Sequence, residues 1–281
     1  DRVTVAVVTD SAAALPRALQ RELDISVVPI LLTVDGNEVA DDALAPHELL
    51  TAGPLSTAAP SPGAFTRAVQ ERQSADGVLV LTLSERLSSC HRSAVLGARE
   101  AGGSTIVVDT ANAAGGQALA VVAAAVAARR GADLAEVADI ARRVATRVRL
   151  IGVLGSLEQL VRSGRIPSMA GRAGDRLGVR PLFDVHEGRI RRLLPSRNTA
   201  RAHGRILDQW RHSRPPEPRA LHVAAVHAGA PADAESILAA VKAECEPATA
   251  LIGGFGGALV ATAGVGVSGL AWWWETSIDP L

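Results

Sequence analysis

Small hydroxyl residues gather at four places in this sequence where an apolar run gives way to a polar loop. Three of these places follow β-branched runs and lie at residues 9–11, 84–89 and 109–110. The fourth is the loop LSTAAPSPG, residues 55–63, directly before a predicted helix. Ligands bind at the carboxyl ends of strands in open parallel sheets, and helix N-termini offer unpaired backbone N–H groups. Hydroxyls that converge there suit an anion such as a carboxylate or a phosphate.

Helix capping is the simpler explanation for the same hydroxyls. Ser11 is the first residue of SAAALPRALQREL, and Ser61 is the first residue of SPGAFTRAVQER, two stretches of helical composition. A serine in this position accepts a hydrogen bond from the backbone at the start of the helix. Capping explains each serine alone, whereas four hydroxyl-rich loops without an acid–base partner favour a binding site. Ser11 and Ser61 are therefore candidate ligand-binding residues.

The stretch GVGVSG, residues 264–269, matches the G-x-G-x-x-G pattern of a dinucleotide-binding turn. Such a turn needs a following helix and, about 20 residues later, an acid that binds the ribose. Here LAWWWETSIDPL follows, which has the composition of a strand and reaches residue 281. We therefore expect no nicotinamide or flavin, and no other cofactor. The glycines instead indicate a tight turn where the backbone approaches a neighbour closely, which makes Gly264 a candidate ligand-facing residue.

Ser88, His91 and Asp109 carry the three side-chain types of a nucleophilic triad. No G-x-S-x-G surrounds the serine, and His91 is predicted one turn into the next helix, pointing away. The histidines show no H-E-x-x-H or similar spacing, so no metal site is expected. Cys90 is expected to be a small buried hydrophobe. An enzyme acting on an acyl or phosphate substrate, a hydrolase or transferase, stays the alternative to a carrier without catalytic residues.

The overall composition indicates a globular protein with a large aliphatic core. Hydrophobic residues make up 48% of the 281 residues and charged residues 21%. With three Phe, four Trp and no Tyr, an apolar pocket must be lined mainly by Ala, Val, Leu and Ile. Two cysteines cannot supply a disulfide framework or a cysteine-based zinc site. The longest apolar run, residues 118–128, is far shorter than the ~20 residues of a membrane span, so we expect a soluble cytoplasmic protein.

Arginine is concentrated between residues 162 and 205, although the whole chain is electrically balanced. Lys+Arg and Asp+Glu number 29 each, so no overall field attracts nucleic acid or an anionic membrane. The simple interpretation of the basic region is a solvated face, and the alternative is a docking surface for an acidic partner protein. Nucleic acid is not an expected partner, because aromatic residues for base stacking are scarce.

Strand and helix patterns alternate over the first 150 residues. Apolar runs predict strands at residues 3–10, 25–34, 77–83, 104–110 and 150–155. The intervening segments have helical composition, at residues 11–23, 61–72, 89–102, 114–131 and 133–148. The alternation predicts an α/β fold whose N-terminal domain, residues 1–149, has a mostly parallel sheet with helices on both faces.

From about residue 150 the pattern changes to strand pairs interleaved with helices. Residues 180–194 predict a hairpin with its turn at HEG, and residues 259–274 a closing loop and strand. A strand is expected at residues 221–229, and helices are expected at residues 198–210 and 233–245. Residues 156–169 are expected to be a helix that runs into a loop. This pattern predicts a C-terminal α/β domain, residues 150–281, that contains antiparallel strands.

Seven segments, in order along nearly the whole chain, resemble motifs of one protein family. They are VVTDSAAALP, STAAPSPGAF, LSERLSSCHRSA, VVDTANAAGGQ, SLEQLVRSGRI, LGVRPLFDVHEGRI and ATAGVGVSGLAW. The matching family motifs include TDS-x-x-x-LP, TSQPSPxxF, S-xx-LSGTYQSA, LxxLxKGGRI and HTGPGALGxxF. Each match is weak alone, but seven in register resemble the DegV family. These are fatty-acid-binding proteins that include the FakB subunits of bacterial fatty acid kinase.

The resemblance implies a two-domain DegV-like fold with one acyl chain buried in a tunnel between the domains. In the family, the Thr of TSQPS and the Ser of LSGT bind the carboxylate, and these positions are Thr57 and Ser88 here. The Arg of GGRI corresponds to Arg165, and the His of HTGPG to Thr262. The implied partners are a long-chain fatty acid and an ATP-binding kinase subunit to which the loaded protein presents the carboxylate. Transient membrane contact would serve lipid exchange.

Three of the matching loops depart from the family pattern. TSQPS is TAAPS in this chain, LSGTYQ is LSSCHR, and HTGPG is TAGVG. The last change places Thr262 where the family has an imidazole, which would change its charge near pH 6.5. A threonine hydroxyl donates one hydrogen bond at any pH. All three departures fall in the region that a kinase subunit would face.

Overall fold

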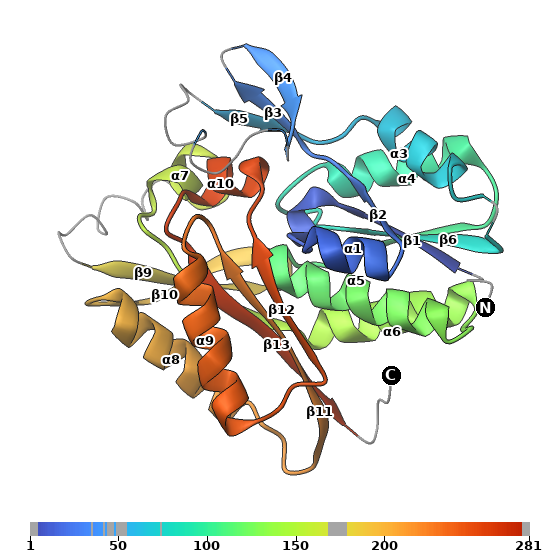
Figure 1. The fold of residues 1–281 in the computed structure, drawn as a ribbon. Coiled ribbons are helices and arrows are strands. Elements are labelled where there is room, and N and C mark those ends of the chain that lie inside the picture. The colour runs from blue at the N-terminus through green and yellow to red at the C-terminus, as the bar shows by residue number, and fades with distance from the viewer. Residues whose placement is uncertain are drawn as a thin grey trace.

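The computed structural model describes residues 5–34, 36–41, 43, 48, 55–73, 75–167 and 179–276. Two large sheets dominate this part of the chain, one in each half of the sequence (Figure 1). The first sheet is parallel throughout, and its strands in spatial order are β2 (Ile25–Val28), β1 (Val5–Asp10), β6 (Gly77–Thr82) and β7 (Thr105–Asp109). All residues of β1 and β6 are buried, as expected for continuous apolar runs that are covered on both faces.

Helices cover both faces of the first sheet. They are α1 (Arg17–Glu22), α3 (Pro62–Gln70), α4 (Cys90–Ala101), α5 (Ala114–Arg129) and α6 (Leu134–Arg147). Because successive strand residues point to opposite faces, Val8 and Val80 pack with side chains of α3 and α4. Val7 and Leu79 lie on the other face, in the core that α5 and α6 share. The predicted parallel sheet with helices on both faces is confirmed.

The second sheet is mixed and mostly antiparallel. Its strands in spatial order are β10 (Arg189–Ser196), β9 (Arg180–His186), β8 (Arg149–Val153), β13 (Ser268–Thr276), β11 (Pro218–His227) and β12 (Thr249–Gly254). Only the β11–β12 pair among these is parallel. The helices α8 (Thr199–His212) and α9 (Pro231–Glu244) pack on its outer face with a separate cluster that includes Ile206 and Trp272. The antiparallel strands predicted for the second half are confirmed.

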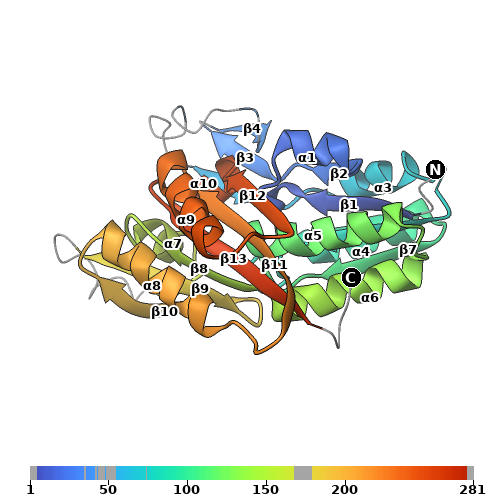
Figure 2. The ribbon, with the colours of Figure 1, turned by 60° about the horizontal axis from the view of Figure 1, so that its bottom comes forward.

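Helix α5 lies between the two large sheets and is buried on almost every side (Figures 1 and 2). Its sequence, AGGQALAVVAAAVAAR, has no polar face, which is typical of a helix enclosed by other elements. Small alanine side chains let the sheets approach it from both sides. One hydrophobic core therefore joins both halves of the molecule. The division into domains 1–149 and 150–281 stays a proposal.

A small antiparallel sheet lies to one side of the two large sheets, next to α7 (Glu158–Arg162) and α10 (Gly257–Ala263), as Figure 1 shows. Its strands in spatial order are β4 (Asn37–Ala40), β3 (Leu31–Val34) and β5 (Ser56–Ala58). Of its strands, only β3 lies within a predicted strand, that over residues 25–34, and the sheet itself was not predicted. It brings the TAAPS loop beside α10, from the opposite end of the sequence.

Several predicted elements differ in the structure. The strand predicted over residues 25–34 is two strands in different sheets, because Pro29 lacks a backbone N–H and interrupts the ladder. The helix predicted over residues 11–23 is a 3₁₀ turn at Ser11–Ala13 followed by α1, which begins after Pro16. Residues 259–263, predicted as part of a loop, belong to α10. Across the described parts of the chain, none of the helices combines the length and apolar composition that a bilayer crossing requires.

Candidate ligand-binding site

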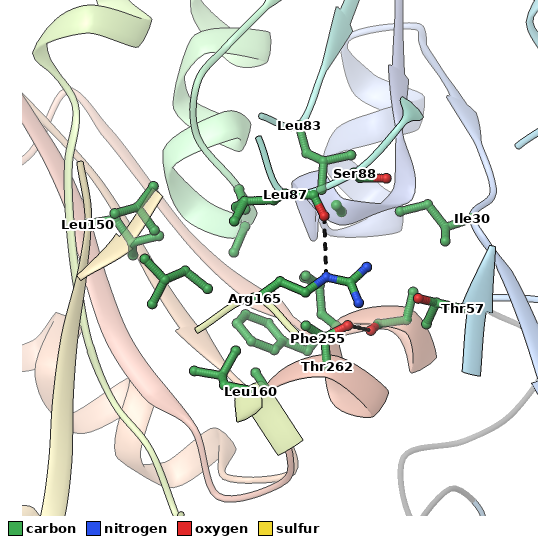
Figure 3. A pocket seen from close by; sticks show the side chains of 18 of the residues that line it. Ile30, Thr57, Leu83, Leu87, Ser88, Leu150, Leu160, Arg165, Phe255 and Thr262 are labelled. Carbon is green, nitrogen blue, oxygen red and sulfur yellow. Dashed lines mark hydrogen bonds between the residues drawn. The ribbon is translucent and has the colours of Figure 1, made fainter. Parts of the chain in front are cut away.

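A largely apolar cavity lies where the two large sheets and the small sheet meet (Figure 3). It contains about 1020 Å³ of space between atoms, counting the solvent at its mouth. Its walls are mostly Ala, Leu, Ile and Val side chains, together with Phe183 and Phe255. The aliphatic wall that the composition predicts is therefore present. Both halves of the chain contribute to it.

The apolar end of the cavity is built by regular elements of the second sheet. Leu150 of β8 and Phe183 and Val185 of β9 line it, and the start of α5 closes it on another side. The Phe183 ring lies directly over Gly152 of the neighbouring strand: a Cβ atom at Gly152 would be 2.6 Å from Phe183 Cε1. The ring position therefore depends on the missing side chain at residue 152.

Four sequence-predicted residues gather at the other, polar end: Thr57, Ser88, Arg165 and Thr262. They come from β5, from the loop after β6, from the turn after α7 and from α10. Figure 3 shows the Arg165 guanidinium among the side chains of Thr57, Ser88 and Thr262, with Leu150 on the far side of the cavity. A ligand that is apolar along its length and anionic at one end matches this arrangement.

Arg165 is positioned by the way that α7 ends. Gly164 has a φ of +75°, and the backbone N–H groups of Arg165 and Ile166 both donate to the Leu160 carbonyl. This left-handed turn is a common helix ending, and glycine adopts it without strain. The guanidinium donates from Nε to the Leu87 carbonyl at 3.3 Å and from Nη1 to the Ser163 carbonyl at 2.7 Å.

The Arg165 side chain has no carboxylate partner among the described residues, although it is only half-exposed. Its two hydrogen bonds orient the planar group and leave Nη2 with no acceptor in the described structure. A planar guanidinium with free donors suits a carboxylate oxygen. Arg165 is thus a cation at the edge of an apolar cavity, with no neutralising carboxylate in the part of the chain that the structure describes.

Ser88 lies in the turn that precedes α4 and interacts with Cys90. Its hydroxyl donates to Cys90 Sγ at 3.1 Å and accepts from the Cys90 backbone N–H at 3.3 Å. Cys90 is fully buried, and this burial raises the pKa of its thiol well above the usual value. The thiol therefore stays protonated and unreactive at neutral pH, in agreement with the predicted small buried hydrophobe.

Thr57 and Thr262 both line the cavity, but their hydroxyls differ in hydrogen bonding. Thr57 lies opposite Leu32 in the small sheet, and its hydroxyl has no hydrogen-bond partner among the described residues. The Thr262 hydroxyl donates to the Ala258 carbonyl one turn earlier in α10, at 2.8 Å. Thr57 is free to donate to a ligand, whereas Thr262 would first have to rotate its hydroxyl.

The other three predicted residues do not line this cavity. The Ser11 hydroxyl accepts from the Ile30 backbone N–H at 2.9 Å and so supports a residue of the cavity wall. Ser61 is the N-cap of α3, and its hydroxyl accepts a hydrogen bond from the Ala64 N–H. This is the helix capping considered from the sequence as the alternative to ligand binding. Gly264 ends α10 with a φ of +84° and lies next to the Gln159 side chain. Contact of these three residues with a ligand stays a prediction.

The triad considered from the sequence is not assembled. His91 Nδ1 lies 3.1 Å from the Thr82 hydroxyl, Asp109 accepts from backbone N–H groups, and Ser88 bonds to Cys90. None of the hydrogen bonds in the described structure connects Ser88, His91 and Asp109 to one another. Within the same residues there is no group of three or more His, Cys, Asp or Glu side chains that could hold a metal ion.

Asp10 is a residue of the site region that sequence reasoning did not single out. Its fully buried carboxylate accepts from the backbone N–H groups of Ala12 at 3.1 Å and Leu83 at 2.8 Å, and from Gln117 Nε2 at 3.0 Å. Ala12 and Leu83 both line the cavity. Burial raises the pKa of Asp10 to about 6, although these hydrogen bonds act in the opposite direction. The sequence signal that could have identified Asp10 is its position at the end of β1, between Thr9 and Ser11.

The fold and the cavity together define an α/β protein that encloses an apolar space between two sheets. A model of the family described as "Uncharacterised protein, DegV family" matches residues 4–275, and the chain belongs to this DegV family. The DegV domain-containing protein Mb2440c of Mycobacterium bovis is 32% identical over 278 residues, which cover 95% of this chain and 96% of that protein. A Thermotoga maritima relative named "Fatty acid-binding protein" is 26% identical and covers 94% of this chain and 96% of its own length.

Solved structures of the family have the same fold. The structure described as "Fatty Acid Binding of a DegV family Protein from Thermus thermophilus" has a TM-score of 0.89 and 26% identity, and covers 97% of this chain and 100% of that chain. A DegV lipid binding protein from Thermotoga maritima has a TM-score of 0.85 and 25% identity, and the match covers 96% of this chain and 98% of that chain. The predicted DegV-like α/β fold is confirmed.

Proposed function

We propose that this chain binds a long-chain fatty acid, with the acyl chain in the apolar part of the cavity and the carboxylate at the polar end. The observation that carries the proposal is Arg165, a cation without a carboxylate partner among the described residues, at one end of an apolar cavity. The relatives and solved structures that are described as fatty-acid-binding or lipid-binding support the same ligand class.

The two ends of the ligand would contribute differently to binding. Burial of a C16 chain at about 0.8 kcal/mol per CH₂ offers a gross ~10 kcal/mol before the cost of ordering ligand and protein. A carboxylate at the edge of this apolar space loses water and needs charged or strong donors in return. Arg165 supplies the charge, and Thr57 and Ser88 supply hydroxyls. The tail provides affinity and the head group sets orientation.

The protein would act as a carrier that presents its ligand and performs no chemistry itself. Ser88 and Arg165 are half-exposed and Ser89 is exposed, so a carboxylate held there can be reached from outside the cavity. A partner enzyme that activates the carboxylate, such as an ATP-dependent fatty acid kinase, fits this geometry. The departures at Ala58, Ala59 and residues 89–91 would alter the surface that such a partner meets.

Native mass spectrometry of the purified full chain, followed by lipid extraction, tests the proposal. We expect one bound molecule in the mass range of long-chain fatty acids, or stoichiometric uptake when palmitic acid is added. A protein that stays empty after addition of fatty acid would contradict the proposal. Turnover of acyl esters by that empty protein would instead indicate the enzyme considered from the sequence.

A further inference from the structure

A buried carboxylate outside the cavity connects two walls of its polar end. Asp41 directly follows β4 of the small sheet, and only 1% of its surface is exposed. Its backbone N–H donates to the Ile30 carbonyl at 2.9 Å, within the N-terminal half of the chain. Its other polar groups reach α10, 217 residues away in the sequence. Asp41 therefore joins the small sheet, which holds Thr57, to the helix that holds Thr262.

Asp41 caps the N-terminus of α10. Residue Gly256 at the N-cap position has no side chain to cap the helix itself. The Asp41 side chain accepts from the Ala258 backbone N–H, and the Asp41 backbone carbonyl accepts from the Gly257 N–H at 3.0 Å. A negative side chain at this end of a helix is favoured both by the unpaired N–H groups and by the helix dipole.

Gly256 provides the space that this carboxylate occupies. A Cβ atom at residue 256 would lie 2.7 Å from Asp41 Oδ2 and 2.8 Å from Oδ1. The φ of Gly256 is −72°, which any residue adopts, so alanine there adds no backbone strain. The absence of a side chain at residue 256 is thus explained by the carboxylate of Asp41.

Helix α10 is one wall of the polar end, and β5 is another. Ala258, Leu259 and Thr262 of α10 line the cavity, as do Thr57 and Ala58 of β5. With only seven residues, α10 is too short to be stable without tertiary contacts. Its position relative to β5 therefore depends on the contacts that hold its N-terminus. Asp41 supplies two hydrogen bonds there, and α10 also packs against α7, β5 and β3.

We propose that Asp41 is a positioning residue for the acyl carboxylate, which it never touches. By capping α10 with the end of β4, Asp41 sets the spacing between α10 and β5 across the polar end, and so favours a fatty acid over an uncharged ligand of the same length. This inference rests on the proposed function. It adds a residue that acts through α10 and not through the ligand.

The test measures the preference for the charged head group. Displacement of a fluorescent fatty acid gives the affinities of dodecanoic acid and dodecan-1-ol for the wild type and for Asp41→Ala. We expect the variant to bind the acid about tenfold more weakly, because loss of a helix cap loosens α10. Affinity for the alcohol should change by less than about twofold, since the tail contacts of Leu150, Phe183 and Val185 lie on β8 and β9, elements that Asp41 does not hold.

The control variant is Asp133→Ala, which removes the aspartate that caps α6, a helix that does not line the cavity. It should lose some thermal stability and keep the wild-type ratio of acid to alcohol affinity. An equal loss for both ligands in Asp41→Ala would show that Asp41 only stabilises the fold, and would overturn the proposal. A wild type that binds neither ligand would instead contradict the proposed function.

Gly256→Ala provides a second, independent route. Its Cβ should displace the Asp41 carboxylate and reproduce the tenfold loss of acid affinity that a lost cap predicts. In the Asp41→Ala background the same change should have no further effect, because the overlapping atoms are gone. Additive losses in this double-mutant cycle would overturn the proposal. If Asp41→Ala does not fold, Asp41→Asn retains an acceptor for the Ala258 N–H and should keep the acid preference, and its loss would also overturn the proposal.

Discussion

The two ends of the cavity are built in different ways. The apolar end is formed by neighbouring strands and by α5, whose residues lie close together in a continuous core. The polar end is formed by short segments from four distant parts of the chain: β5, the loop after β6, the turn after α7, and α10. The apolar end is held by packing of regular elements, and the polar end by individual hydrogen bonds between segments.

This difference assigns separate tasks to the two ends. Packed strands and helices change little in shape, so under the proposed function the apolar end would set which chain lengths fit. Segments held by a few hydrogen bonds and helix caps adjust more easily, so the polar end suits a site that receives a head group and exposes it to a partner. Substitutions at the apolar end should change selectivity for the tail, and those at the polar end selectivity for the head group.

The largest expected effect concerns the buried carboxylate behind the polar end. Burial raises the pKa of Asp10 from 3.8 to about 6 in the folded state, so the protonated carboxyl stabilises the fold at low pH and this stability is lost as the pH rises through 6. The loss amounts to about 3 kcal/mol. Urea unfolding of wild type and Asp10→Asn at pH 4 to 7 should show the wild-type advantage falling with pH. A constant or rising difference would contradict this assignment.

At the apolar end, Gly152→Ala should narrow the cavity. The new Cβ would overlap the Phe183 ring, and the open space into which the ring can move is the cavity itself. Loss of room for two or three CH₂ groups should weaken palmitic acid binding by about 2 kcal/mol, or roughly thirtyfold. Dodecanoic acid should bind almost as in the wild type. Equal losses for both acids would show that Phe183 does not limit chain length.

At the polar end, Arg165→Ala should weaken fatty acid binding by about 2 kcal/mol, the usual worth of a hydrogen bond to a charged group. Arg191→Ala is the matched control, because Arg191 is exposed and pairs with Asp184 in the β9–β10 hairpin. Isothermal titration with dodecanoic acid and dodecan-1-ol compares the two variants. Similar, negligible effects of both substitutions would return Arg165 to the solvated basic face.

Replacement of both Thr57 and Ser88 by alanine should weaken fatty acid binding by about 1 to 2 kcal/mol in total, because a neutral hydroxyl contributes less than a guanidinium. The fold should be unchanged, since neither hydroxyl holds two elements together. Ser61→Ala serves as the control hydroxyl, because Ser61 caps α3 outside the cavity lining. Unchanged affinity in the displacement assay would remove Thr57 and Ser88 from the head-group site.

The smallest expected effect is a pH response at residue 262. The threonine hydroxyl does not titrate, so wild-type affinity should vary little between about pH 6.5 and 8, where the ligand carboxylate stays ionised. Thr262→His should add a pH dependence centred near 6 to 7, with tighter binding of the anion at the acidic side. Binding titrations at several pH values provide the measurement. A variant that binds equally at every pH would show that residue 262 does not face the head group.

The sequence by itself predicted the elements that local pattern controls. Continuous apolar runs specified β1 and β6, and the all-apolar pattern of residues 114–129 specified a helix enclosed on all sides. The order of seven short motifs identified the family and marked Thr57, Ser88, Arg165 and Thr262, which the structure brings to one end of the cavity. These features depend on residue type and on near neighbours in the chain.

Only the tertiary structure decided how the remaining polar groups are used. Ser11 and Ser61 lie in hydroxyl-rich loops that suggested ligand binding. In the structure their hydroxyls accept hydrogen bonds from the backbone. Arg165 has no carboxylate partner among the described residues, and Asp41 caps α10 from 217 residues away, and neither feature has a local sequence pattern. A hydrogen bond is specific to groups within about 3 Å of each other, and folding selects those groups through packing of the whole chain and not through their spacing in the sequence.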